Sequence, residues 1–143
     1  MKTYIIKEVT QHNSSRINDL LRMLNDKVPA IGTHRLEELL KDDTFNLFAA
    51  EDENGTIAGM LTLTCCPTLL RNKYWIEDVI VDEAFRGRGA GRALVKAAVR
   101  HVRSIEESPV IYLTSNPTRT CARQLYRSEG FEEYETGVFR IIF

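Results

Sequence analysis

The chain has 143 residues, the length of one ordinary domain with a buried core. Apolar residues make up 43% and charged residues 27%, close to ordinary globular usage, so the composition suggests neither a disordered nor a fibrous protein. The net charge is −1 and both signs are spread along the chain, which argues against a surface for nucleic acid or for anionic membranes. We predict a single domain spanning residues 1–143 whose partners are small molecules or proteins.

No segment has the composition of a membrane span or a secretory signal. No apolar run approaches the roughly eighteen residues that a membrane-spanning helix needs, and the apolar start of the chain is interrupted at Lys7. Cys65, Cys66 and Cys121 form neither a disulfide framework nor a CxxC metal pair, and the histidines are scattered. We expect a cytoplasmic protein with no membrane partner, no metal and no histidine-based triad.

The first third of the chain predicts one strand and two helices. Residues 3–9 are rich in β-branched and aromatic side chains, as strands are. A helix capped by Ser14 or Ser15 follows, because apolar residues recur there at helical spacing. A second helix is predicted from Thr33 to about Asp42, after an irregular link.

A hairpin is predicted next. Strands at residues 45–50 and 56–66 flank Asn54-Gly55, a dipeptide typical of tight hairpin turns. A further strand spans residues 74–82, and a helix then runs to about Arg103.

The last third predicts three strands and one helix. A strand at residues 110–114 precedes a helix from about Pro117 to Ser128, which Gly130 stops. Two short strands, residues 131–134 and 138–143, complete the chain. The order βααβββαβαββ predicts an α+β (mixed α/β) fold, with a mixed sheet of about seven strands and helices on both faces.

A loop rich in glycine and arginine joins the strand at residues 74–82 to its helix. The first N–H groups of a helix lack intrahelical partners and carry the positive end of the helix dipole, so they favour an anion. Glycines let the backbone approach a ligand, and arginines pair with phosphate oxygens. The loop therefore predicts a phosphate site. Its residues are Arg86, Gly87, Arg88, Gly89, Ala90, Gly91 and Arg92.

The spacing within the loop separates the kinds of phosphate site. The dinucleotide fingerprint GxGxxG fails because its sixth position falls on Arg92 or Leu94, and no Lys-Ser or Lys-Thr pair makes a P-loop. Arg86, Gly89 and Gly91 fill the pattern [RQ]xxGx[GA] instead, after the strand sequence IEDVIV. This combination resembles the acetyl-CoA loop and fourth strand of the GNAT N-acetyltransferase superfamily. A plain glycine-rich turn with solvated arginines is the alternative for the loop taken alone.

A second motif lies beyond the strand at residues 110–114. From Arg119 to Phe131 the chain reads RTCARQLYRSEGF, which is similar to the closing GNAT pattern RxxAxx[FL]YxxxGF. Two motifs in the right order are far rarer by chance than either alone. The resemblance extends over the entire length and implies a single GNAT domain with acetyl-CoA as its cosubstrate.

The resemblance also implies where acetyl-CoA is held. The pantetheine arm lies along the fourth strand as an added strand does, and an N–H there, that of Val79, polarises the thioester carbonyl. The loop amides hold the pyrophosphate, and Asn116 reaches the pantetheine arm. The implied cofactor-binding residues are Val79, Ile80, Val81, Arg86, Gly87, Arg88, Gly89, Ala90, Gly91, Arg92 and Asn116.

Acetyl transfer to an amine requires two proton movements. A lysine-like amine, with a pKa of about 10.4, is neutral in only about one molecule in a thousand near neutral pH, so a carboxylate that takes its proton is useful. Glu77 and Asp78 lie on the fourth strand, where period-two alternation sends them to opposite faces. We favour Glu77 as the base, directly or through water; a solvated or arginine-paired role is the alternative. By resemblance, Tyr126 protonates the leaving thiolate, and a purely structural tyrosine is the alternative there.

The acceptor is weakly encoded. In the superfamily it is often shaped by the segment between the first two helices and by the loop between the third and fourth strands. Leu69 and Leu70 in that loop are candidates for a substrate lip or a dimer contact, so a homodimer stays open. The acidic residues near the first segment either attract a cationic amine or form an ordinary solvated face. They are Asp26, Glu37, Glu38, Asp42 and Asp43.

We rank the primary amine of a small molecule first, such as an aminoglycoside, a polyamine or an amino sugar, acetylated by direct transfer in a ternary complex. A protein N-terminus or lysine ranks second. A sensor module that binds acyl-CoA without turnover is the alternative from another class, but a pure binder needs neither Tyr126 nor Glu77. The failed loop spacings disfavour a nucleotide-binding module.

Overall fold

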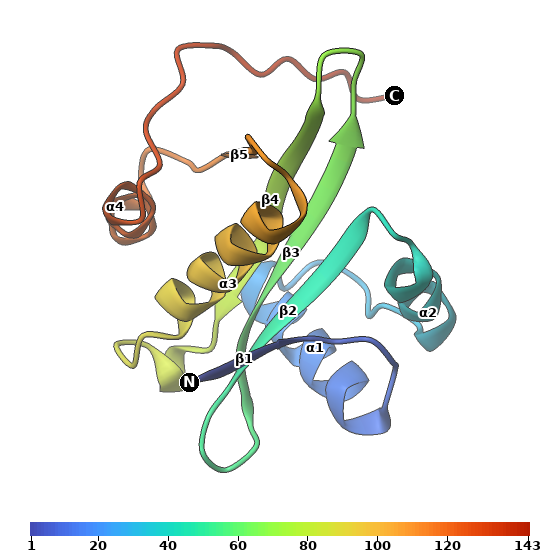
Figure 1. Cartoon of the computed structure of the whole chain (residues 1–143). Coiled ribbons are helices and arrows are strands. Elements are labelled where there is room, and N and C mark those ends of the chain that lie inside the picture. Colours follow the sequence, from blue (N-terminus) through green and yellow to red (C-terminus); the bar gives the residue numbers. More distant parts are fainter.

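The computed structural model describes residues 1–143 and contains one five-stranded sheet, four helices and a short 3-10 turn (Figure 1). The elements are β1 (Lys2–Ile5), α1 (Gln11–Leu24), α2 (Thr33–Lys41), β2 (Phe45–Glu51), β3 (Ile57–Pro67), β4 (Asn72–Val81), the 3-10 turn (Glu83–Phe85), α3 (Ala90–Ile105), β5 (Val110–Leu113) and α4 (Thr120–Ser128).

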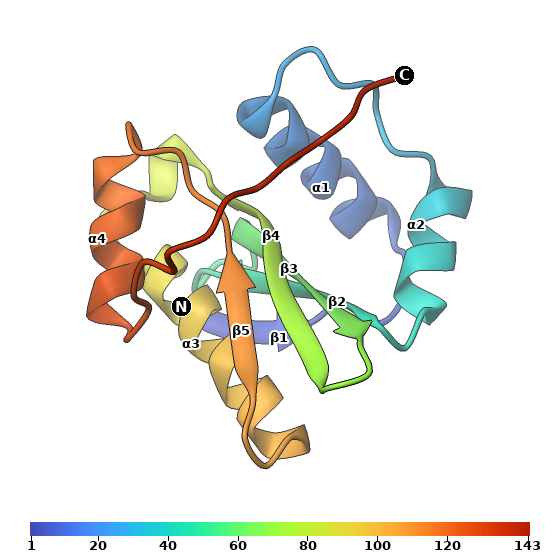
Figure 2. The same ribbon diagram turned by 90° about the horizontal axis from the view of Figure 1, so that it is seen from above.

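The strands lie in sequence order across the sheet. Pairs β1–β2, β2–β3 and β3–β4 are antiparallel, whereas β4–β5 is parallel. Helices α1 and α2 cover one face and α3 and α4 the other (Figures 1 and 2), which confirms the predicted mixed α+β fold with helices on both faces. None of the four helices has the length and apolar content that crossing a membrane requires.

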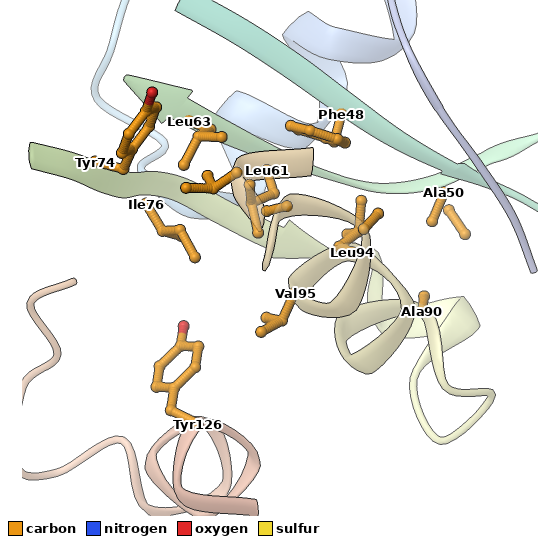
Figure 3. Close-up of a cluster of buried hydrophobic side chains, with 14 residues drawn as sticks. Phe48, Ala50, Leu61, Leu63, Tyr74, Ile76, Ala90, Leu94, Val95 and Tyr126 are labelled. Atoms are coloured by element: carbon orange, nitrogen blue, oxygen red, sulfur yellow. The ribbon is translucent and has the colours of Figure 1, made fainter. Parts of the chain in front are cut away.

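Buried side chains form one cluster on each face of the sheet. The α3-side cluster, drawn in Figure 3, consists of Phe48, Ala50, Ala58, Leu61, Leu63, Tyr74, Ile76, Ala90, Leu94, Val95, Ala97, Ala98, Val102 and Tyr126. The α1-side cluster consists of Ile6, Ile17, Leu20, Leu36, Leu47, Ala49, Ile57, Met60 and Ile80.

The hairpin predicted at Asn54-Gly55 is confirmed. It joins β2 to β3, and Gly55 adopts a φ of +81°. The Asp52 carboxylate closes the turn by accepting N–H bonds from Asn54 at 3.0 Å and Thr56 at 2.9 Å. The start of α1, in contrast, lies earlier than predicted. Thr10, rather than Ser14 or Ser15, caps the helix through a reciprocal capping box with Asn13.

The start of α4 also differs from the prediction. Pro117 lies before the helix, in a turn in which the Asn116 side chain accepts N–H and O–H bonds from Thr118, so α4 begins only at Thr120. Gly130 does follow the helix with a φ of +96°, as a C-terminal glycine should.

The prediction of about seven strands is wrong, because residues 131–134 and 138–143 form no strand. No backbone hydrogen bond involves residues 132–143. Strand composition alone does not make a strand, which also needs a paired neighbour for its N–H and C=O groups. The observed order is therefore βααβββαβα.

Candidate active site

A β-bulge interrupts β4 halfway along its length. Glu77 pairs with Thr62 and Ile80 with Met60, so Asp78 and Val79 together occupy one step of the ladder. Asp78 has a φ of +48°, a left-handed conformation that aspartate tolerates better than most residues. The Thr62 hydroxyl, buried beside it, donates a 2.9 Å hydrogen bond to the Asp78 carboxylate and holds the bulge in place.

The bulge shifts which face each later side chain occupies. Ile76 packs in the α3-side cluster, whereas Ile80, four residues on, packs in the α1-side cluster. Thr62 stands opposite Glu77 in the ladder and contacts Asp78, so both carboxylates lie on the face that α1 and α2 cover. The prediction that alternation sends Glu77 and Asp78 to opposite faces is therefore wrong, because the extra residue breaks the period of two.

The negative charge of Asp78 affects the ionisation of its neighbour Glu77. Partial burial, and then the negative charge of Asp78, raise the pKa of Glu77 above its ordinary value. A raised pKa brings a carboxylate closer to the range in which a general base works best at neutral pH. The bulge thus places a candidate base beside a second acidic group.

The bulge also marks the point where β4 and β5 part (Figure 2). Strand β5 pairs only with Lys73 to Ile76, so the β4 backbone from Glu77 to Val81 has no strand partner on that side. An extended ligand arm is able to hydrogen-bond to such an open edge. Ile80 can contribute only its backbone there, because its side chain is buried in the α1-side cluster.

The glycine and arginine loop presents a run of free amides. Of the six N–H groups from Gly87 to Arg92, none donates to a protein acceptor. Gly87 has a φ of +77°, and Gly89, the residue that precedes α3, has a φ of +82°. Both glycines lie just before the N-terminus of the 16-residue helix α3. The free N–H groups at a helix N-terminus favour an anion. The loop therefore has the donors that a pyrophosphate requires.

The three loop arginines each have a contact within the chain. Arg92 pairs with Glu129 of α4, the Arg88 guanidinium lies 5.3 Å from the Phe85 ring centre, and Arg86 lies 3.7 Å from the exposed Glu83. The exposed Arg86–Glu83 pair is weak. The backbone amides, which have no acceptor within the chain, are the part of this candidate anion site that the loop geometry provides.

Tyr126 projects from α4 toward β4, with its hydroxyl directed at the region of Ile76 (Figure 3). The residue is only 6% exposed, and burial raises the pKa of its hydroxyl, so the group stays protonated. This hydroxyl makes no hydrogen bond within the chain, and it is not among the fully enclosed polar atoms that lack a partner. The Tyr126 hydroxyl is therefore free to donate a proton.

Asn116 lies in the exposed loop between β5 and α4. Its Oδ1 accepts from the Thr118 N–H at 3.0 Å and from the Thr118 hydroxyl at 2.8 Å, which leaves Nδ2 as a free donor.

The sequence analysis missed Thr62 as a residue of this site. The signal was a hydroxyl in the middle of the apolar strand sequence IAGMLTLTCC, where a buried hydroxyl needs a polar partner. No three His, Cys, Asp or Glu side chains converge as metal ligands would.

The comparison with protein families agrees with this geometry. A model described as the acetyltransferase (GNAT) family matches residues 17–131, about four fifths of the chain. The chain belongs to this family. Its members are enzymes that transfer acetyl groups, and the β4 bulge, the loop amides and Tyr126 all lie within the matched part of this GNAT domain.

Individual relatives are more distant. The spermine/spermidine N(1)-acetyltransferase of Bacillus subtilis (strain 168) is 28% identical over 60 residues, 42% of this chain and 40% of that protein. N-alpha-acetyltransferase RimI of Mycobacterium tuberculosis (strain ATCC 25618 / H37Rv) is 29% identical over 87 residues, 61% of this chain and 52% of that protein. The matches thus span less than two thirds of either relative's length.

Among solved structures, the aminoglycoside acetyltransferase meta-AAC0020, from an uncultured soil metagenomic sample, is similar over nearly its whole length. It was crystallised with trehalose, and it matches with a TM-score of 0.84 and 20% identity over 99% of this chain and 96% of that chain. This likeness supports the GNAT fold of the present chain.

Proposed function

We propose that this GNAT chain is an acetyl-CoA-dependent N-acetyltransferase that acts on the primary amine of a small, cationic molecule, by direct transfer in a ternary complex. The observation that carries the proposal is the bulged β4, which offers an open backbone edge on the β5 side and two carboxylates on the α1 face. Tyr126 approaches the same strand from α4.

The residues of the chain fit acetyl-CoA. The six free amides from Gly87 to Arg92 suit its pyrophosphate, and the open β4 edge from Val79 to Val81 suits the amide-containing pantetheine arm. Asn116 Nδ2 is a further free donor from the opposite side of the gap. When bound, acetyl-CoA supplies an acetyl group already activated as a thioester.

Glu77 would prepare the acceptor. Its carboxylate takes a proton from the ammonium group, directly or through water, and the raised pKa of Glu77 reduces the mismatch between the two groups. Asp78 stays beside it, held by Thr62, and its charge attracts a cationic acceptor. Glu77 is the proton acceptor, and the charge of Asp78 helps to raise its pKa.

Two groups would act on the other side of the strand. The Val79 N–H, at the bulge, donates a hydrogen bond to the carbonyl oxygen as negative charge develops on it. The Tyr126 hydroxyl, kept protonated by burial, donates its proton to the departing sulfur.

A cationic small amine suits this site best. Glu77 and Asp78 give the acceptor face two neighbouring acidic groups. One relative is named for spermine and spermidine, and one structural neighbour is named for aminoglycosides. All of these compounds carry several amino groups. Amino sugars also carry a primary amine and stay within the proposed class. A protein N-terminus is the second candidate, which the likeness to RimI favours.

Ligand stabilisation followed by an acceptor screen tests this proposal. We expect acetyl-CoA to raise the melting temperature by several degrees at saturation, and ATP and NAD to have no effect. Thiol release should then be fastest with polyamines or aminoglycosides and slow with peptides. Release with peptides alone would favour protein acetylation, and stabilisation without release for any amine would favour an acyl-CoA sensor.

The pH dependence tests the carboxylate pair. Because Glu77 must be deprotonated to act as a base, kcat/KM should fall as pH drops through its raised pKa. Replacement of Asp78 by asparagine removes a charge that raises this pKa. The fall of kcat/KM at low pH, the acidic limb of the pH profile, should therefore move to lower pH. Asparagine still accepts from Thr62 and tolerates the left-handed φ.

Two further variants complete this experiment. Glu77→Gln should lower kcat/KM by roughly a hundredfold and remove the acidic limb. Asp43→Asn, which removes the same charge from an exposed site in the loop before β2, should leave the limb where it is. An unmoved limb in Asp78→Asn would contradict the coupling of the two carboxylates.

A further inference from the structure

Asp82 follows β4 and begins the turn that leads into the loop of free amides. Its Oδ1 accepts a 2.9 Å hydrogen bond from the Ala84 N–H, and its carbonyl oxygen accepts another, also 2.9 Å, from the Phe85 N–H. Its own N–H donates to the Ala58 carbonyl of β3 at 2.9 Å. Asp82 therefore fixes where the chain leaves the sheet, shortly before the first free amide, that of Gly87.

Arg16 reaches the same carboxylate from α1. Its Nη2 donates to Asp82 Oδ2 at 2.5 Å, and its Nε donates to the Ile57 carbonyl, at the start of β3, at 2.7 Å. Both side chains are largely buried, with 16% of Arg16 and 13% of Asp82 exposed. A planar guanidinium that donates to two separate acceptors is held in one orientation.

The Asp82 carboxylate thus joins two elements through different oxygens. Oδ2 faces Arg16, and Oδ1 faces the amide of Ala84. The hydrogen bond from Arg16, and then that from Ala84, keeps the pKa of Asp82 below its ordinary value, so the carboxylate stays charged. Without the guanidinium, this largely buried carboxylate loses its counter-charge and turns toward water. The Ala84 N–H then loses its fixed acceptor.

This contact differs from the exposed ion pairs of the chain. The pairs made by Arg22, Arg35 and Arg86 each join residues three positions apart. Arg16 and Asp82 lie 66 positions apart. Their pair connects α1, on one face of the sheet, to the turn that leads into α3, on the other face (Figures 1 and 2). It therefore fixes the start of the amide loop to a helix of the opposite layer.

We propose that Arg16 is a positioning residue for acetyl-CoA, which acts through Asp82 to hold the turn at residues 83–85 and so directs the amides of residues 87–92 at the pyrophosphate. This role rests on the proposed function, because it concerns the same cosubstrate. Donors that are already in position bind more tightly than donors that binding must first order. Arg16 acts on the affinity for acetyl-CoA and not on the acetyl-transfer step.

Separate measurements of affinity and turnover test this role. In Arg16→Met the dissociation constant of acetyl-CoA should rise about tenfold in calorimetric titration, while kcat at saturating acetyl-CoA changes less than about threefold. Arg16→Lys keeps the charge but not the planar pair of donors, so its affinity should lie between those of the parent chain and Arg16→Met. If Arg16→Met does not fold by circular dichroism, Arg16→Lys carries the comparison.

Arg22→Met is the matched control. It removes the same charge from an exposed site on the same helix, where the arginine pairs with Asp19 and not with the turn. Its affinity for acetyl-CoA should equal that of the parent chain. An equal loss of affinity in Arg22→Met would mean that the charge of the helix is responsible, which overturns the specific role of Arg16.

A double-mutant cycle tests the route through Asp82. Asp82→Asn keeps an oxygen that accepts from Ala84 but removes the charge that faces Arg16. If Arg16 acts through Asp82, the variant with both Arg16→Met and Asp82→Asn should bind acetyl-CoA no more weakly than the weaker single variant. Losses of affinity that multiply would mean that the two residues act independently, which overturns the proposal.

Hydrogen exchange followed by NMR measures the turn itself, without acetyl-CoA. The Ala84 amide should exchange at least about fivefold faster in Arg16→Met than in the parent chain. The Asn54 and Thr56 amides are the internal control, because the Asp52 carboxylate holds them in a similar way, and they should keep their rates. Unchanged exchange at Ala84 would show that Arg16 does not hold the turn.

The outcomes separate this inference from the proposed function. A parent chain that does not bind acetyl-CoA overturns both. A parent chain that binds acetyl-CoA, together with an Arg16→Met variant that binds it equally well, overturns only the role of Arg16. Weaker binding in Arg16→Met with unchanged kcat, faster exchange at Ala84 and no loss in Arg22→Met supports it.

Discussion

Gly89→Val should abolish acetyl-CoA binding in a protein that still folds. Gly89 precedes α3 with a φ of +82°, a conformation that a β-branched residue adopts only at a cost of about 1–3 kcal/mol. An added Cβ meets no neighbour within 4 Å, so the loop has room to relax by rotating its peptides. That rotation changes the directions of the free amides of residues 87–92, on which the proposed pyrophosphate contact depends. We expect affinity to fall at least about a hundredfold in calorimetric titration.

The chain offers a closely matched control for this change. Gly55, in the β2–β3 hairpin, has a φ of +81° and also has nothing within 4 Å of an added Cβ. Gly55→Val therefore imposes the same backbone strain far along the sequence from the loop. Both variants should melt at a lower temperature, but only Gly89→Val should lose acetyl-CoA. Equal affinities in the two variants would show that the amides of the loop do not form the anion site.

Tyr126→Phe should lower turnover at least about tenfold and leave acetyl-CoA affinity nearly unchanged. The ring is buried in the α3-side cluster, which a phenylalanine ring fills equally well. The hydroxyl makes no hydrogen bond within the chain, so its removal costs the folded state little. What is lost is the proton that the burial-raised pKa of Tyr126 keeps available for the leaving sulfur. Single-turnover kinetics with a saturating amine measure the effect.

Tyr74→Phe separates this role from general packing. Tyr74 is also buried in the α3-side cluster, but its hydroxyl donates a 2.8 Å hydrogen bond to Glu106 at the end of α3. Its replacement should lower the free energy of unfolding by about 1 kcal/mol in urea and change turnover less than about threefold. If Tyr126→Phe keeps full turnover, another group protonates the thiolate.

Local sequence signals determined most of the fold. Asn54-Gly55 predicts the hairpin because only a few residues accept positive φ in a tight turn, and the helical spacing of apolar residues predicts α1, α2 and α3. The loop from Arg86 to Arg92 was recognisable for the same reason. Its backbone needs glycine where φ is left-handed, so the glycines recur at a characteristic spacing in the sequence. These features depend on the conformations of a few consecutive residues.

Features that depend on a partner elsewhere in the chain were decided only by the tertiary structure. Residues 131–134 and 138–143 have strand composition, but their own sheet pairs with neither segment. The bulge at Asp78 depends on the register between β3 and β4 and on the hydroxyl of Thr62, sixteen residues away, which no local pattern around Glu77 reveals. That bulge places both carboxylates on one face and opens the β4 edge, because one extra residue in a ladder reverses every side chain beyond it.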